Sequence, residues 1–362
     1  MAESKVHWMK DWAGAWGMRG ENWSPWVGCT PCSPGCDNCW ARRLEDGRLR
    51  HLGRCAPKII ETLAGPVGNP NGVWNDIVTP YFSRGPVYQG DKALMLPTRA
   101  QKPRLFWCCP QSDPLHEDIP DRQIYDMLAV AGATPCHSHL FLTKRGARML
   151  DIVGADRARE RAHGQAEGWS LEMGDTLWSA GWPLPNVTLG LTVCTPEEAD
   201  AKVRHLLELG AAGWRTMLSI EPMLGPVDLT DVLADTLCYA TGCGWRGWRD
   251  ADAPRGTRLI YVDEPRGNDW EEVCPNCGGS MLMDAERGPD EKALLDWVIV
   301  GAESGKDRRP CPLEWVRPVV EQCADAGVPC YVKQLDIDGK LSRDPSEWPE
   351  WARVRQVPER PN

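Results

Sequence analysis

The sequence predicts an α/β fold, a (β/α)₈ barrel or a partial TIM-like barrel with one inserted segment. Three observations predict it: short β-type apolar runs recur along the chain, helical sequence lies between several of them, and polar residues follow them. Parallel strands need helical crossovers, so this alternation is typical of a parallel barrel. With 362 residues, 42% of them hydrophobic and 25% charged, the chain can bury the core of such a domain.

Eight apolar runs are the expected strands. They lie at 26–28, 93–96, 105–108, 139–142, 187–191, 216–220, 297–300 and 330–332. Helices are expected between several of them, for example at 121–130 and 196–207. The second of these helices begins with Thr195, Pro196 and two acidic residues, an arrangement typical of a helix N-terminus.

Polar residues follow six of the expected strands directly. They stand at 111–113, 143–145, 192, 221–223, 301–304 and 333–334. In a parallel barrel the carboxyl ends of the strands surround one mouth, where the active sites of such folds lie. We therefore expect these residues to share one site rather than to be independent solvated loop residues.

The alternation stops between residues 235 and 288, and this segment has four cysteines in two pairs. Cys238 and Cys243 form the first pair, and Cys274 and Cys277 form the second, in the sequence CPNCGG. Two such pairs are typical of a zinc ribbon, with free thiols or a second cluster as alternatives. The expected organisation is a first barrel part at 1–234, a zinc-ribbon-like insertion at 235–288, and the last barrel part with a C-terminal tail at 289–362, the structural zinc folding the insertion.

A second group of cysteines, Cys29, Cys32, Cys36 and Cys39, lies within eleven residues near the N-terminus. The last three have C-x₃-C-x₂-C spacing, which is typical of a loop that binds three irons of a 4Fe–4S cluster and leaves the fourth iron open. S-adenosylmethionine can chelate that iron and be cleaved to a 5′-deoxyadenosyl radical. This is the radical-SAM signature. A zinc site on all four cysteines, or incidental thiols, are the alternatives.

Seven blocks in the same order resemble one family over nearly the whole chain, namely the phage-associated three-Cys-motif proteins related to radical-SAM enzymes. The blocks are WSPWVGC (23–29), SPGCDNCWA (33–41), SDPLHED (112–118), LTKR (142–145), SIEPMLGP (219–226), VGAESG (300–305) and VKQ (332–334). The resemblance implies Cys29, Cys36 and Cys39 as cluster ligands, whereas the common radical-SAM loop would use Cys32. We favour Cys29, because it directly ends the first expected strand, with Cys32 as a neighbour or an alternative ligand.

Roles for the remaining polar residues follow from what S-adenosylmethionine requires. Its amino group needs a carboxylate or carbonyl oxygens, its carboxylate needs a cation, and its ribose needs polar side chains. We expect Ser112 and Asp113 at the amino group, and Lys144 or Arg145 at the carboxylate or at a substrate phosphate. The expected cofactor-binding set is Ser112, Asp113, Arg145 and Thr192, and the expected catalytic, substrate-facing set is Lys144, Glu221, Glu303 and Lys333, beside Gln334.

The net charge of −10 argues against a surface that binds nucleic acid along its whole length. A local basic cluster follows the cysteine loop, however, and aromatic residues lie near it: Arg42, Arg43, Arg48, Arg50, Arg54 and Lys58, with Trp40 and Trp107. We expect a DNA, RNA or nucleotide base as substrate; a solvated helix face is the alternative reading of the cluster.

The alternative functions are peptide modification and a non-catalytic, zinc-stapled binding module. A flavodoxin or ferredoxin is the expected electron donor. No run of about 18 apolar residues and no signal peptide are evident, so we expect a soluble, cytoplasmic protein without membrane partners.

Overall fold

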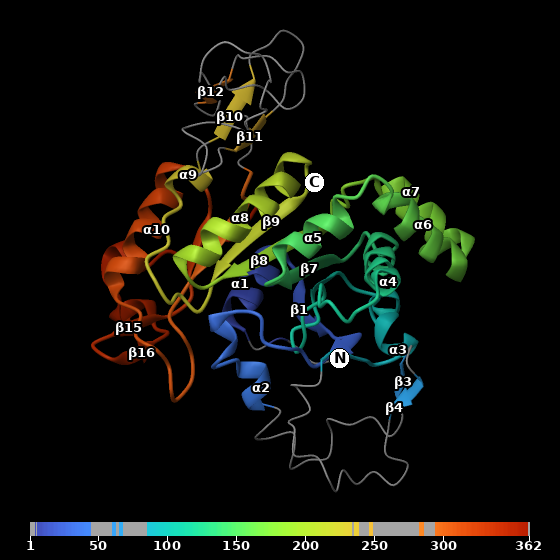
Figure 1. Ribbon diagram of the computed structural model, residues 1–362, viewed down its shortest axis with the longest axis horizontal. Helices are drawn as coiled ribbons and strands as arrows, with labels where there is room; N and C mark the ends of the chain where they lie inside the picture. The colour runs from blue at the N-terminus through green and yellow to red at the C-terminus, as the bar shows by residue number, and fades with distance from the viewer. Residues whose placement is uncertain are drawn as a thin grey trace, which may run out of the picture.

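The computed structural model describes residues 4, 6–43, 85–230, 232–233 and 294–360 in full. Residues 44, 60–62, 65–67, 231, 235–238, 246–248 and 282–285 are described by their backbone. The main element is an open sheet of seven parallel strands that follow one another in chain order (Figure 1). These strands are β1 (Arg19–Trp23), β6 (Arg104–Cys108), β7 (Ser138–Thr143), β8 (Val187–Val193), β9 (Arg215–Ile220), β13 (Trp297–Val300) and β14 (Cys330–Val332). The sheet curls into a half-barrel, which confirms the expected partial TIM-like fold.

Six of the eight expected strands are strands of this sheet, from β6 to β14. The expected strand at 93–96 is wrong, because these residues overlap the short helix α3 (Asp91–Leu94) and the turn that follows it. A four-residue apolar run does not distinguish a strand from a buried helical turn. The indole Nε1 of Trp23 donates to the carbonyl oxygens of Ala93 and Leu94, which caps this turn.

The expected strand at 26–28 exists as β2 (Trp26–Val27), but it pairs antiparallel with β5 (Val87–Tyr88) outside the main sheet. Cys29 therefore follows a short strand of a separate two-stranded sheet, not the first barrel strand. That strand is β1, whose sequence RGENW looks too polar for a buried position. Glu21 is nevertheless buried, because Arg104 of the neighbouring strand lies 3.1 Å from its carboxylate.

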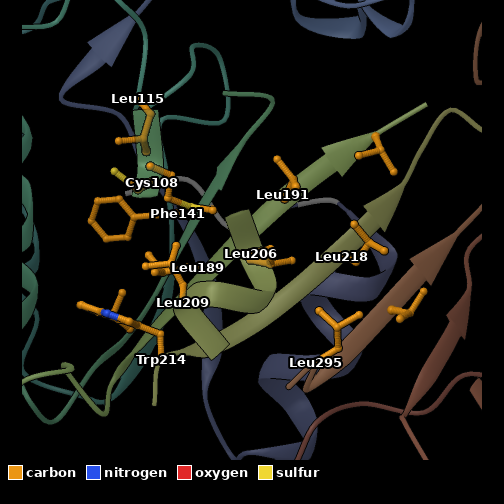
Figure 2. Close-up of a cluster of buried hydrophobic side chains, with 14 of the residues drawn as sticks. Cys108, Leu115, Phe141, Leu189, Leu191, Leu206, Leu209, Trp214, Leu218 and Leu295 are labelled. Atoms are coloured by element: carbon orange, nitrogen blue, oxygen red, sulfur yellow. The ribbon is translucent and has the colours of Figure 1, made fainter. Parts of the chain in front are cut away.

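Helices lie on the outer side of the half-barrel, in the connections between its strands (Figure 1). They are α4 (Asp121–Gly132), α5 (Gly146–Val153), α6 (Ala158–Trp169), α7 (Leu171–Ala180), α8 (Pro196–Ala211), α9 (Thr230–Leu233) and α10 (Leu313–Asp325). Of these, α6 and α7 pack against α4 rather than on the sheet. Figure 2 shows the core between them and the sheet, where Leu206 and Leu209 of α8 lie over Leu189 and Leu218. The expected helices at 121–130 and 196–207 are confirmed as α4 and α8.

The inner face of the half-barrel is filled by α1 (His7–Ala15), which precedes the first strand. Trp8, Met9 and Trp12 of this helix are buried against inward-pointing residues of the strands, among them Trp297. The Trp8 ring lies 5.2 Å from that of Trp107 and 6.0 Å from that of Trp297. The helix thus fills part of the barrel interior, and residues 6–8 at its start border the cavity at the carboxyl ends of the strands.

Between β9 and β13 the structure describes three short strands outside the main sheet. They are β10 (Asp235–Cys238), β11 (Arg246–Trp248) and β12 (Leu282–Ala285), which form an antiparallel sheet in the order β11-β10-β12. Cys238 ends β10 and is described by its backbone. Cys243, Cys274 and Cys277 lie outside the described residues, so the expected zinc site stays a prediction.

The remaining elements are short. They are the hairpins β3 (Ile60–Thr62) with β4 (Gly65–Val67) and β15 (Leu335–Ile337) with β16 (Lys340–Ser342), the helix α2 (Trp40–Leu44), and single 3₁₀ turns. None of the described helices has the length and apolar content needed to cross a membrane.

Candidate functional site

A cavity of about 420 Å³ lies at the carboxyl ends of the strands and is bounded by the cysteine loop. It brings together twelve residues that the sequence analysis singled out for the reaction and its cofactors. They are Cys29, Cys32, Cys36, Cys39, Ser112, Asp113, Lys144, Arg145, Thr192, Glu221, Glu303 and Lys333. Each of the six polar clusters that follow the expected strands contributes to its wall. The clusters therefore lie together at one cavity, and their roles in a functional site stay a prediction.

The cysteine loop begins at Gly28, whose φ of +87° suits glycine. A Cβ at this residue would lie 2.5 Å from the carbonyl oxygen of Gly85. The Gly28 N–H donates to Gln111 O (3.0 Å), and Ser112 Oγ donates to Gly28 O (2.5 Å). Ser112 therefore fixes the start of the loop through its hydroxyl.

Further along the loop, the Ser33 hydroxyl caps a single 3₁₀ turn, Pro34–Cys36 (η1), by accepting from Gly35 N. The Cys39 N–H donates to Cys36 O, and α2 follows directly. Cys29, Cys36 and Cys39 are half-buried, whereas Cys32 is exposed. The four thiols thus surround one end of the cavity on a loop of fixed local structure.

An ion-pair cluster that we call the Arg145 clamp holds the first part of the loop. Arg145 is buried; its Nη1 donates to Asp113 Oδ2 (2.9 Å), its Nε to Glu117 (2.7 Å), and its Nη2 to Thr30 O (3.2 Å). Its Nη1 also lies 3.9 Å from Cys29 Sγ. The guanidinium therefore connects the end of β7 to the cysteine loop and is fully engaged with the protein.

Asp113 is the acidic centre of this clamp. Its Oδ1 accepts from Thr143 Oγ1 (2.6 Å) and Leu115 N (2.9 Å), and its Oδ2 accepts from Lys144 N (3.1 Å) as well as from Arg145. Four hydrogen bonds from the protein occupy this buried carboxylate. Its observed contacts are those of a residue that positions the ends of β6 and β7.

A second cluster, the Glu303 clamp, holds the other part of the loop. Arg309 Nη2 donates to Glu303 Oε1 (2.6 Å), and its Nε donates to Glu303 Oε2 (3.0 Å). The same guanidinium donates to Asp37 and to Pro34 O, and Asn38 Nδ2 donates to Glu303 Oε2. Although burial raises the pKa of Glu303, hydrogen bonds from Arg309 lower it on balance. We expected Glu303 to face a substrate, yet its contacts anchor the loop.

The middle of the loop lies against the ends of β8 and α8. Ser33 Oγ donates to Glu198 Oε2 (3.1 Å), which also accepts from Cys194 N (2.9 Å). At Gly35 the backbone passes so close to Cys194 that a Cβ would overlap its Sγ. Buried His116 lies with its Nε2 2.7 Å from Thr30 Oγ1. The loop is therefore held by the Arg145 clamp, by the Glu303 clamp, by the residues at the end of β8 and the start of α8, and by His116.

The thiols of the loop differ in acidity. The pKa of Cys36 is lowered to about 6, mainly because the Cys32 thiol donates a hydrogen bond to it, with Lys144 adding a favourable charge. The same hydrogen bond raises the pKa of Cys32, and burial raises that of Cys29 to about 12. In the described part of the chain, no three His, Cys, Asp or Glu side chains converge on a position for a single metal ion.

Lys144 differs from the other charged residues of the cavity. Within the residues that the structure describes, its ammonium forms no hydrogen bond or ion pair. Burial lowers its pKa, but the thiols of Cys194, Cys36 and Cys39 raise it on balance above the ordinary lysine value. The hydroxyl groups of Thr192 and Ser219, on inward-facing positions of β8 and β9, also line the cavity. These groups remain available to a ligand.

Glu221 and Lys333 form an ion pair in the cavity wall, with Lys333 Nζ 2.9 Å from Glu221 Oε1. The two residues follow β9 and β14, whose carboxyl ends flank that of β13. As expected, both line the cavity, and the pair joins two parts of its wall. A substrate group that enters here would meet both charges.

Several residues of the site were missed by sequence reasoning. These are Glu198, Arg309 and Arg343, together with His116 and Glu117 as residues that anchor the loop. Arg309 and Arg343 lie five and nine residues beyond the strand-end clusters at 301–304 and 333–334, too far for the strand-end rule to find them. The position of Glu198 could have been predicted, because it is the third residue of α8 and its N–H donates to the N-cap residue Thr195.

Part of the expected basic cluster can be located. Arg42 lines the cavity, and Arg43 lies against the backbone of Gly305, while Arg48, Arg50, Arg54 and Lys58 lie outside the described residues. Trp40 and Trp107 both line the cavity, with ring centroids 6.5 Å apart. Trp40 is 44% exposed, so its ring faces solvent beside the cysteine loop.

The model of one protein family matches residues 12–344, which include every strand of the sheet and most of the cavity wall. That family is described as "Protein of unknown function (DUF5131)". No curated protein and no solved structure matches the chain. The family description assigns no chemistry, so the site itself must support any function.

Proposed function

The chain belongs to the DUF5131 family, and we propose that it is a radical S-adenosylmethionine enzyme that acts on a nucleic-acid or nucleotide base. One observation carries the proposal. The cysteine loop and the polar residues after six strands surround a single cavity at the carboxyl end of a parallel half-barrel. This is the position at which barrel enzymes do their chemistry.

The donor set fits a 4Fe–4S cluster. Cys29, Cys36 and Cys39 are half-buried thiols on one short loop, and in such a cluster each cysteine binds its own iron instead of converging on one ion. Exposed Cys32 is the alternative third ligand. When bound, the cluster with S-adenosylmethionine on its open iron supplies a 5′-deoxyadenosyl radical. The cavity volume lies within the range of about 300–1,000 Å³ for small-molecule sites.

The residues of this chain divide into two groups under the proposal. The Arg145 and Glu303 clamps hold the loop, which keeps the thiols at one end of the cavity. Lys144, whose ammonium has no partner among the residues that the structure describes, is the cation for the carboxylate of S-adenosylmethionine, in place of Arg145. The hydroxyl groups of Thr192 and Ser219 suit its ribose, and the Glu221–Lys333 pair faces the substrate.

The proposed substrate class rests on the family resemblance and on one aromatic residue of the cavity wall. The resemblance to phage-associated three-Cys-motif proteins implies a phage setting, in which base modification or repair is a plausible need. Trp40 lines the cavity with an exposed ring, and such rings stack on bases. We therefore propose a base as substrate rather than a peptide, and a flavodoxin or ferredoxin as electron donor.

Anaerobic reconstitution with iron and sulfide tests the reaction. We expect about four irons per chain, an electron paramagnetic resonance signal that changes when S-adenosylmethionine is added, and 5′-deoxyadenosine with methionine after dithionite reduction. Cys36→Ala should lose the cluster, whereas Cys136→Ala, at an exposed cysteine outside the cavity, should keep it. No iron uptake, or uptake without 5′-deoxyadenosine, would contradict the enzyme proposal and favour a zinc-stapled binding module.

A further inference from the structure

We propose that Arg343 recognises a phosphate of the substrate and that Gln334 positions it for this role. The inference rests on the proposed function and deepens it, because it names the chemical group by which the substrate is held. Arg343 follows β16, in the hairpin after the last barrel strand, and it lines the cavity with an exposed side chain. Its position is therefore the open side of the cavity.

The charges that line the cavity leave a local excess of positive charge. Its three carboxylates are each paired with a cation of the protein: Asp113 with Arg145, Glu221 with Lys333, and Glu303 with Arg309. In the described ranges, two lining cations, Lys144 and Arg343, have no carboxylate partner. Because the whole chain carries a net charge of −10, this excess is specific to the cavity and favours an anionic ligand.

The Arg343 guanidinium is oriented by a buried amide. Its Nε donates to Gln334 Oε1 (3.0 Å), and Gln334 Nε2 donates to Ala302 O (2.6 Å). Gln334 is 2% exposed, and its own carbonyl accepts from Ala302 N. Among described residues, the two Nη groups of Arg343 have no hydrogen-bond acceptor. A guanidinium fixed through Nε presents these donors as a planar fork that matches phosphate oxygens.

Lys144 and Arg343, which have no carboxylate partner among the described residues, come from different strands of the sheet. Lys144 follows β7 and lies beside the thiols of the cysteine loop, so we assign its charge to the cofactor. Arg343 comes after the edge strand β14, and we assign it to the substrate. Trp40 provides an exposed aromatic ring in the same cavity wall. An anion-binding fork together with a stacking ring suits a nucleotide that carries a phosphate, either free or within a strand.

Equilibrium dialysis of the full chain after anaerobic reconstitution tests this inference without turnover. The probes are the four 2′-deoxynucleosides, their 5′-monophosphates and a mixed-sequence single-stranded DNA of about ten nucleotides, at several salt concentrations. Wild-type protein should bind the phosphorylated probes more tightly than the nucleosides. Arg343→Ala should reduce this preference by about 10- to 100-fold, the effect expected for charge-assisted hydrogen bonds.

Two further variants sharpen the test. Arg343→Lys keeps the charge but loses the planar fork, so its phosphate preference should lie between those of wild type and Arg343→Ala. Arg122→Ala is the matched control, because Arg122 also donates from Nε to a glutamine, Gln165, but lies outside the cavity. It should bind the probes like the wild type. Thermal unfolding of each variant establishes that the fold is intact.

The pattern of binding decides the source of the phosphate. Preference for the monophosphates supports a free nucleotide as substrate, and preference for the oligonucleotide supports a nucleic-acid strand. Either preference supports the inference if Arg343→Ala removes that preference. Equal affinity for nucleosides and phosphorylated probes, equal loss in Arg122→Ala, or no binding of any probe would overturn it. Iron uptake and 5′-deoxyadenosine formation are measured separately, so failure of this inference is distinguishable from failure of the proposed enzyme activity.

Discussion

Asp113 and Arg145 form a buried ion pair between the carboxyl ends of β6 and β7, with Nη1 2.9 Å from Oδ2 and each side chain 6% exposed. Arg145 also donates to Thr30 O and lies against Cys29, so this pair couples the end of the sheet to the cysteine loop. Asp113 and Arg145, which the sequence indicates as cofactor ligands, line the cavity, but their polar atoms are bonded to protein groups. Their charges therefore hold the cysteine loop in place.

Replacement of Asp113 should destabilise the protein strongly. Asp113→Ala leaves the Arg145 guanidinium buried without its main partner, which typically costs about 3–5 kcal/mol in the free energy of unfolding. Glu321→Ala removes the exposed Arg317–Glu321 pair and should cost less than about 1 kcal/mol. Urea unfolding of the two variants measures both values. Similar small losses in both would contradict a structural role for the Arg145 clamp.

The lowered pKa of Cys36 should make it the most reactive thiol of the metal-free loop. A pH of 7 is above the Cys36 pKa of about 6, so Cys36 is mostly thiolate. Cys29, with a pKa of about 12, is protonated at this pH. Iodoacetamide should therefore modify Cys36 first, and the rate should fall as the pH drops below about 6 because the thiolate is the nucleophile. Peptide mass spectrometry across a pH series measures the rates.

The hydrogen bond from Cys32 gives a control for this prediction. Cys32→Ala removes the donor and should shift the Cys36 rate profile to higher pH, while Cys32→Ser keeps a hydroxyl donor and should shift it less. A Cys36 profile that is unchanged in Cys32→Ala would show that another group stabilises its thiolate.

The sequence predicts the strands and the site well where the signal is local. The runs 105–108 to 330–332 are mainly apolar, as is typical of parallel strands that are covered on both faces, and they are buried strands in the structure. The polar residues that follow them then meet in one cavity because the carboxyl ends of parallel strands lie at the same end of the sheet. The position of a polar residue directly after an apolar run can be seen in the sequence, so this grouping can be predicted without the structure.

The parts that sequence reasoning missed depend on partners that are distant in the chain. The polar strand β1 is buried because Glu21 has Arg104 beside it, and nothing within RGENW indicates that pairing. Glu303 was expected to face a substrate, but Arg309 and Asn38 occupy its carboxylate. A carboxylate after a strand looks the same in the sequence whether it faces a ligand or an arginine, so its role follows only from three-dimensional contacts.

The two groups of cysteines should be separable by metal content. Replacing Cys274 and Cys277 by serine should remove zinc and lower the yield of folded protein, because a small insertion depends on its metal for folding. The iron content should persist, since the loop that carries Cys36 is held by the barrel. Metal analysis of the reconstituted variant measures both. Parallel loss of iron would show that the two groups do not form separate sites.

The contact between Gly35 and Cys194 gives a sharper test of how the loop is seated. A Cβ at Gly35 would overlap Cys194 Sγ, while its next contacts, Pro222 Cδ at 3.2 Å and Cys194 Cβ at 3.4 Å, are tolerable. Gly35→Ala should therefore displace the loop, lower the free energy of unfolding by about 1–3 kcal/mol as overpacking does, and reduce iron uptake. The same substitution at Gly164 of α6, where the Cβ would meet nothing within 4 Å, should instead stabilise the protein by about 0.5–1 kcal/mol.

Removal of the Cys194 sulfur should rescue the displaced loop. In Gly35→Ala with Cys194→Ala, the added methyl group takes the space that the sulfur leaves, so the double variant should be more stable than the sum of the single effects predicts. Contacting residues couple by about 0.5–3 kcal/mol, which a double-mutant cycle in urea resolves. Iron uptake should recover together with stability, because the fixed position of the loop is what keeps its thiols at the cavity. Recovery of stability without recovery of iron uptake would mean that Cys194 itself is needed at the metal site. Additive effects of the two substitutions on the free energy of unfolding would mean that the loop does not pack against Cys194 at the end of β8.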